Sequence, residues 1–129
     1  MNGANINLAS DTIKIALLSS SYTPDFDTHD FFDDVTGELA NGTGYTSGGN
    51  TLASPVVSQD NTDNEGVFDC ADPTWTFTAV KTFRYAVIYK STGVAGTSPL
   101  IFLIDFGEDI TTSAVFSLLL AAEGLININ

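Results

Sequence analysis

Two short apolar runs, residues 83–90 and 100–106, are joined by a loop of small residues. Both runs are too short for most helices, are rich in β-branched and aromatic residues, and are bounded by Gly, Ser, Thr or Pro. This pattern predicts a strand, a loop and a strand. Neither strand has a purely polar face, so the pair is expected to lie centrally in a sheet or to bury its second face against another subunit.

Side chains alternate across a pleated strand, and this rule predicts which residues share a face. In the first run one face carries Phe83, Tyr85, Val87 and Tyr89. In the second run one face carries Leu100, Phe102, Ile104 and Phe106, and the opposite face carries Ile101, Leu103 and Asp105.

The rest of the chain repeats the pattern of short strands. Further strands are predicted at residues 12–18, 51–58, 67–71, 74–80, 114–120 and 125–128. Trp75 and Phe77 alternate with threonines, and Ile13, Ile15 and Leu17 share one face of the first strand. Roughly eight strands separated by turn signals favour an all-β fold, an antiparallel β-sandwich or barrel. A short helix remains an alternative for residues 114–122, because Ala and Leu favour helices.

The length of 129 residues predicts a single domain. Residues 1–10 are small and polar apart from Ile6 and Leu8, and they are interpreted as an N-terminal arm preceding one β domain at residues 11–129. At most one short helical turn is expected, at residues 30–35. The Gly-rich residues 37–49 are expected to form a long, exposed connection.

The chain is strongly acidic, with 16 Asp and Glu residues against 4 Lys and Arg residues and a net charge of -12. This charge predicts that nucleic acids and anionic membrane surfaces are not partners. The first ten residues lack the basic region of a signal peptide, and the longest apolar run, residues 115–122, is shorter than a membrane span. Synthesis inside a cell is therefore expected, and the single cysteine excludes an intramolecular disulfide.

The residue types that usually perform chemistry are sparse. His29 stands between Asp27 and Asp30, but a metal site needs three or four ligands at a compatible spacing, so a loop histidine is expected. Cys70 lies in an apolar strand and is interpreted as a small buried hydrophobic residue. No nucleophile elbow or phosphate-binding loop is present. We therefore predict that the protein is not an enzyme and uses no cofactor or metal.

Four stretches carry a family resemblance, at residues 11–35, 42–49, 84–93 and 97–107. They include the runs DTIKIALLSSSYTPD, GTGYTSGG, RYAVIYK and SPLI, whose order and spacing resemble a family of small virion proteins of tailed bacteriophages. The resemblance implies a structural protein of the particle, made in the host cytoplasm. The role it implies most directly is a capsid decoration, or cement, protein on the outer surface of the head, with the major capsid protein and copies of itself, as trimers, for partners.

Two other classes stay open at this stage. The protein could be a tail or neck component, or a virion-surface module that binds host carbohydrate. A carbohydrate site would need exposed aromatic residues, and the candidates are Tyr22, Phe26, Tyr45 and Trp75. For Trp75, the alternation with threonines favours a position in the core instead. A contact with a capsid would instead use apolar residues on irregular segments. The predicted interface residues are Ile6, Leu8, Phe31, Phe32 and Tyr45.

Overall fold

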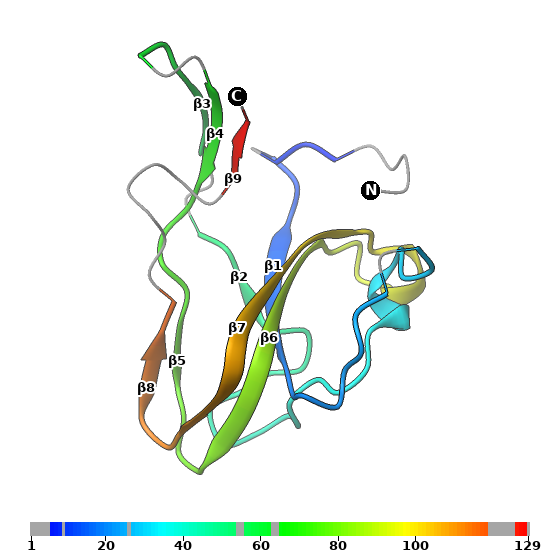
Figure 1. Ribbon diagram of the computed structural model, residues 1–129, viewed down its shortest axis with the longest axis vertical. Coiled ribbons are helices and arrows are strands. Elements are labelled where there is room, and N and C mark those ends of the chain that lie inside the picture. Colours follow the sequence, from blue (N-terminus) through cyan, green and yellow to red (C-terminus); the bar gives the residue numbers. More distant parts are fainter. Residues whose placement is uncertain are drawn as a thin grey trace.

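The computed structural model describes residues 6–8, 10–25, 27–53, 56–62, 65–118 and 126–128. These residues form antiparallel strands with two 3-10 turns and no α-helix, which confirms the all-β prediction (Figure 1). The strands lie in three sheets that do not close into a barrel. They are β1 (Ile13–Leu18), β2 (Asn50–Thr51), β3 (Val56–Asp60), β4 (Glu65–Asp69), β5 (Thr74–Thr76), β6 (Lys81–Lys90), β7 (Leu100–Thr112), β8 (Val115–Ser117) and β9 (Ile126–Ile128).

The largest sheet has the strand order β2-β1-β6-β7. β6 pairs with β1 on one side, from Ile13 opposite Lys90 to Leu18 opposite Tyr85, and with β7 on the other. Most of β6 is buried, as expected for a strand with apolar side chains on both faces. β6 therefore occupies the central position that the sequence predicts, whereas β7 forms the edge of the sheet.

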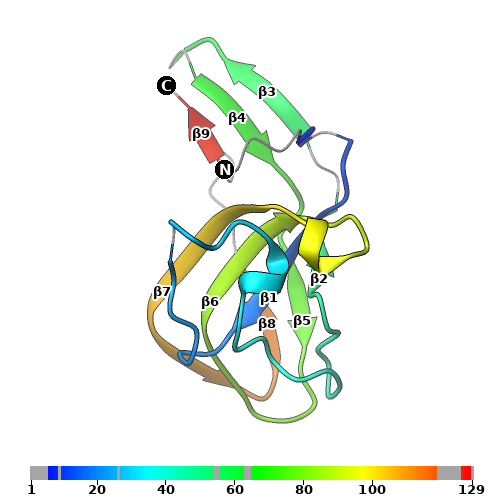
Figure 2. The same ribbon diagram turned by 90° about the vertical axis from the view of Figure 1, so that its right-hand side faces the viewer.

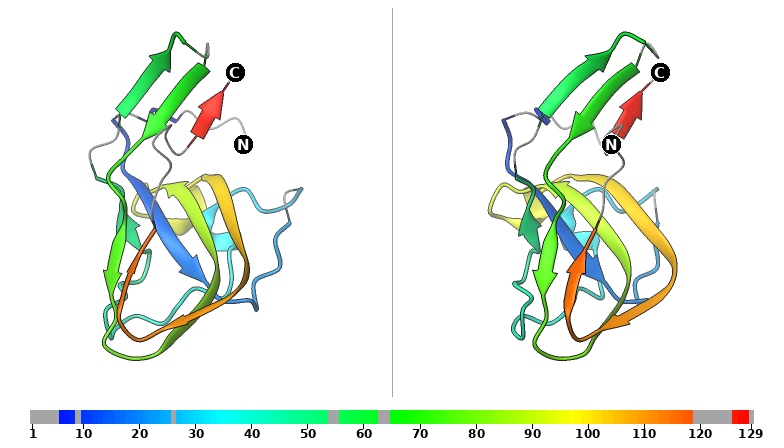
Figure 3. Two further views of the ribbon diagram at one scale, coloured as in Figure 1. Left: turned by 60° about the vertical axis from the view of Figure 1, so that its left-hand side comes forward. Right: turned by 90° about the vertical axis from the view of Figure 1, so that its left-hand side faces the viewer.

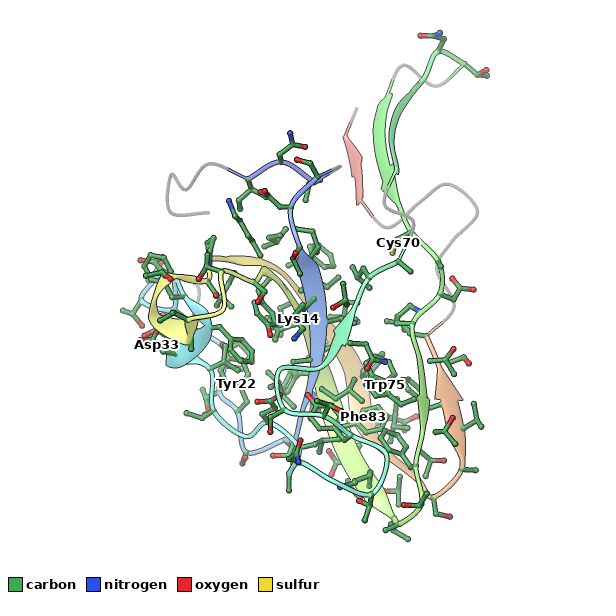
Figure 4. All side chains as sticks on the ribbon, turned by 180° about the vertical axis from the view of Figure 1, so that it is seen from behind. Lys14, Tyr22, Asp33, Cys70, Trp75 and Phe83 are labelled. Atoms are coloured by element: carbon green, nitrogen blue, oxygen red, sulfur yellow. The ribbon has the colours of Figure 1, made fainter. Side chains whose placement is uncertain are left out.

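One face of this sheet is covered by the two-stranded sheet of β5 and β8. Aromatic side chains fill the layer between them, and Figure 4 shows Trp75 and Phe83 inside the body. The Phe83 ring packs edge-on against Phe116, with the ring centroids 4.8 Å apart, and against Phe106 at 6.0 Å. Edge-to-face contacts of this kind add to the free energy gained from burial.

The opposite face of the sheet is covered by the loop that follows β1. A second cluster forms there from Ala16, Leu18, Tyr22, Tyr85, Val87 and Tyr89. The alternation predicted for β1 is confirmed, because Ile13, Ile15 and Leu17 belong to the first cluster and Ala16 and Leu18 to the second. Both faces of β1 and β6 are thus covered within one chain.

Two irregularities change the predicted faces of β6 and β7. The pairing register shifts between Phe83 and Tyr85, and Phe83 packs in the first cluster while Tyr85 packs in the second. The register shifts again between Ile88 and Tyr89, which skips Ile101 in the pairing. Ile101 then packs against the same cluster as Ile104, whereas Leu100 packs against the second cluster. The predicted faces of both Leu100 and Ile101 are therefore wrong. Bulges of this kind re-aim side chains and bend the strand.

The predicted helical turn is the 3-10 turn η1 (Phe32–Asp34), and a second one, η2 (Ala95–Thr97), lies in the loop between β6 and β7. Val115–Ser117 forms a strand rather than the alternative helix, and residues 119–122 lie outside the described residues. The strand predicted at residues 51–58 is two separate strands, β2 and β3, in different sheets.

The third sheet, with strand order β3-β4-β9, extends from one end of the body (Figures 1 and 3). β3 and β4 form a hairpin in register from Val56 opposite Asp69 to Asp60 opposite Glu65. β9 adds to the outer side of β4, which brings a segment near the end of the chain beside a hairpin from its middle.

Candidate docking surface

Phe31 and Phe32 lie on the turn that the sequence places at residues 30–35. The Phe32 ring stacks on Tyr89 of β6, with the ring centroids 4.1 Å apart and the planes 11° from parallel. Both phenylalanines keep part of their surface exposed. The turn is fixed to the body by this stack, and the remaining surface of the two rings is open to a partner.

Backbone hydrogen bonds attach the same turn to the start of β7. The Phe32 amide donates to the Ser98 carbonyl over 2.9 Å, and the Leu100 amide donates to the Asp30 carbonyl over 2.9 Å. Phe31 and Pro99 form an antiparallel bridge between these two bonds. Residues 30–32 therefore act as a very short strand beside the beginning of β7.

The side chain of Asp34 stabilises the turn through hydrogen bonds to the backbone of the same turn. Its Oδ2 accepts hydrogen bonds from the backbone amides of Phe31, at 3.1 Å, and Asp30, at 3.0 Å. These two bonds lower the pKa of the Asp34 carboxyl below its usual value, because they favour the charged form. The carboxylate thus satisfies two backbone amides at the start of the turn.

His29 behaves as the expected loop histidine. Its Nδ1 lies 2.9 Å from the Tyr22 hydroxyl, within hydrogen-bond distance. Burial raises the pKa of Tyr22, and the nearby carboxylates of Asp34 and Asp25 raise it further. Among the described residues, no group of three or more His, Cys, Asp and Glu side chains is placed to hold a metal ion.

Tyr45 is a core residue, and this corrects its assignment to the interface. Its side chain is only 2% exposed and belongs to the first cluster. The Tyr45 hydroxyl donates to Glu38 Oε1 over 2.8 Å and accepts from the Leu17 amide over 3.1 Å. Burial, followed by the Glu38 carboxylate, raises the pKa of Tyr45 far above its ordinary value. The prediction failed because it treated a segment without regular structure as exposed.

Most residues of the Gly-rich segment from 40 to 47 are exposed, as predicted, but the segment packs against the body at the buried Tyr45 and Gly49. At Gly44 and Gly49 the backbone φ angles are +95° and +80°, which favour glycine. A Cβ at Gly49 would overlap the Ile15 carbonyl oxygen, and one at Gly44 would overlap that of Thr76. The glycines of the GTGYTSGG run thus allow close approach of this segment to β1 and β5, so the run has a structural explanation.

Ile6 and Leu8 are partly buried and pack against the first cluster. The backbone amide of Asn7 donates to Asp11 Oδ2 over 2.7 Å, and Asp11 also forms an ion pair with Lys90 at 3.1 Å. The described part of the arm is therefore attached to the body. Residues 1–5 and 9 of the predicted arm lie outside the described residues.

The predicted interface residues do not gather on one surface. Ile6, Leu8 and Tyr45 contact the first cluster, whereas Phe32 contacts the second, on the opposite face of the large sheet. Of the predicted carbohydrate contacts, Tyr22, Tyr45 and Trp75 are buried, and Phe26 lies outside the described residues. The buried Trp75 Nε1 has no hydrogen-bond partner among the described residues.

Sequence reasoning missed a surface that the sheet order creates. β7 lies at the edge, and its apolar residues remain partly accessible, with Phe102 44% exposed. Figure 2 shows β7 as the outermost strand of the body. Two apolar faces on this strand are visible in the sequence, but its edge position depends on the long-range pairing of β6 with β1.

No protein family model, no curated protein and no solved structure matches this chain. The described residues contain no helix with the length and hydrophobicity needed to cross a membrane.

Proposed function

We propose that this protein is a structural virion protein of a tailed bacteriophage, and that it decorates the outer surface of the head by binding the major capsid protein. The proposal starts from the four stretches that resemble small virion proteins. Copies of the protein, as trimers about local three-fold axes of the shell, are proposed as its second partner. Binding in many equivalent positions is how such a protein would stabilise a shell.

The observation that carries the proposal is the half-covered edge strand β7. Its apolar side chains reach both faces of the large sheet, yet several remain partly accessible, including Ile101, Phe102 and Leu103. Single exposed apolar residues are common on proteins, but neighbouring ones along one strand edge form the kind of surface that can bind another protein. The exposed parts of Phe31 and Phe32 lie beside the beginning of the same strand.

The net charge of -12 supports the same role. Like charges keep separate copies soluble before assembly, and they favour binding to a basic patch on an assembled shell. An association of this kind should weaken as salt concentration rises, because salt screens exposed charges.

The test is the position and copy number of the protein in the intact particle. Cryo-electron microscopy, combined with quantitative mass spectrometry, should find on the order of hundreds of copies on the outer face of the head, in a fixed ratio to the major capsid protein. A count in the low tens, at the neck, tail or fibres, would contradict decoration and assign the protein to connection or host adsorption. Purified protein should also bind expanded shells and not free glycans.

A further inference from the structure

Within the described part of the chain, the outer edge of β7 is largely unpaired. Residues 30–32 bridge only its beginning, through the bonds at Ser98 and Leu100. No other strand in the described part of the chain pairs with this edge, and β7 is the outermost strand of the body in two views (Figures 2 and 3). A strand edge offers a row of backbone donors and acceptors that can pair with a further strand.

The chemistry along this edge changes from apolar to acidic. Residues 101–104 carry no charge, and Phe102 is the most exposed apolar side chain among them. Asp105, Glu108 and Asp109 follow, and all three are exposed. Asp105 is partly neutralised by Arg84, whose Nε lies 3.2 Å from its Oδ1. Neither Glu108 nor Asp109 has an ion-pair partner among the described residues.

This charge pattern discriminates between possible occupants of the edge. A second copy of the chain would bring a body with the same net charge of -12 and a second acidic strand end to the edge, and like charges close together oppose pairing. A segment with apolar side chains beside residues 101–104 would meet complementary groups there. Lysine or arginine at one end of the segment would meet Glu108 and Asp109, which lie in the irregular part of β7 where the pairing with β6 skips residues 106–109. The acids therefore disfavour pairing of this edge with a second copy, so contacts within a trimer would use another surface, and they favour a basic partner at the edge.

We infer that the free edge of β7 is a docking site for an extended, basic segment of a partner protein, which adds as an antiparallel strand. Every described strand pair in this protein is antiparallel, and residues 30–32 begin such a row beside β7. In that direction the basic residues of the segment precede its apolar residues. The inference rests on the proposed function for the partner's identity, an arm or loop of the major capsid protein.

The first test uses the full-length protein and expanded shells that lack it. Phe102→Lys should weaken binding at least about tenfold, because a charge then faces the apolar part of the docked strand. Val80→Lys is the matched control, since Val80 is also exposed, at 66%, but lies outside β7. Equal binding by both variants, with unchanged melting temperatures, would overturn the inference while leaving the proposed function intact.

Charge reversal tests the acidic half of the edge. The double variant Glu108→Lys, Asp109→Lys should weaken binding to the shells and make it less sensitive to salt. Asp27→Lys with Asp72→Lys changes the net charge by the same amount at exposed positions outside β7 and outside η1, and should bind more strongly than the edge variant. If both double variants lose the same affinity, net charge alone drives binding and the inference is wrong.

Photo-crosslinking separates failure of the inference from failure of the proposed function. A benzoylphenylalanine at position 102, placed in the protein during particle assembly, should crosslink to a basic segment of the major capsid protein. A crosslink to a basic segment of a neck or tail protein would keep the docking site and contradict decoration of the head. A crosslink to another copy of this chain, or none in the particle, would overturn the inference.

Discussion

Gly49 couples the Gly-rich segment to the first strand of the sheet. Its φ of +80° and its approach to the Ile15 backbone both require the absence of a side chain. Gly93 also has a positive φ, +88°, but no atom lies within 4 Å of the position that its Cβ would take. Both residues therefore have a backbone conformation that favours glycine, but only Gly49 also lacks room for a side chain.

Gly49→Ala should destabilise the protein considerably more than Gly93→Ala. Both variants incur about 1–2 kcal/mol for placing alanine at positive φ, and Gly49→Ala adds about 1–3 kcal/mol for overpacking against β1. Urea unfolding followed by fluorescence would measure both free energies of unfolding. Equal losses would show that the segment moves away from β1 at little cost.

Tyr89 also acts at the scale of a single residue, and it links stability to alkaline pH. Its hydroxyl donates to the Gly48 carbonyl over 2.6 Å. Burial, followed by the Glu38 carboxylate, raises the pKa of Tyr89 from 10.0 to about 12. Between these values the folded protein keeps a proton that the unfolded chain releases, so the free energy of unfolding falls as the pH rises through that window.

Tyr89→Phe should lower stability at pH 7, through the lost hydrogen bond, and should flatten the decline between pH 10 and pH 12. One fewer titrating group removes up to about 1.4 kcal/mol per pH unit from the slope. Urea unfolding at several pH values would measure it. An unchanged slope in the variant would exclude Tyr89 as a source of the alkaline loss.

At the scale of elements, the short turn η1 is held by a ring stack on β6 and by hydrogen bonds to its own carboxylate. Phe32 stacks on β6, and Asp34 accepts the amides of Asp30 and Phe31. The turn then bridges β7 through Phe31 and Pro99. The carboxylate and the ring thus add to the two backbone hydrogen bonds, at Ser98 and Leu100, that hold residues 30–32 at the start of the docking edge.

Asp34→Asn should reduce stability at neutral pH and make the protein less sensitive to acid. The folded-state pKa of Asp34 lies below its ordinary value of 3.8, so its contribution is present above that pH and is lost as the pH falls through the folded-state pKa. Asp33→Asn is the control, because exposed Asp33 accepts neither amide. Identical acid unfolding curves for the two variants would contradict this role of Asp34.

At the scale of the whole molecule, the described part of the N-terminal arm completes the first core cluster. Ile6 and Leu8 pack there, although they lie before the first strand. The predicted contact with a partner and the observed packing in the core would use the same side chains, those of Ile6 and Leu8. A partner that used Ile6 and Leu8 would have to take them from the core or contact only their exposed parts.

The double variant Ile6→Ala, Leu8→Ala should lose about 1–3 kcal/mol of stability, because both residues are partly buried. Val94→Ala, at a position 62% exposed, should change stability by less than about 0.5 kcal/mol. Thermal unfolding of the isolated protein would compare them. Unchanged stability in the double variant would show that the arm contributes nothing to the core. It would favour the predicted role of Ile6 and Leu8 in binding a partner.

The sequence by itself determined the all-β class, the alternation of Ile13, Ile15 and Leu17, and the inward position of Trp75, because local alternation and turn residues specify strands. Only the tertiary structure decided that Tyr45 is buried, that Ile101 changes face and that β7 forms an edge. Those features depend on which distant strands pair and where the register slips. Alternation within one segment contains no information about its neighbours, so the docking edge became visible only in the folded chain.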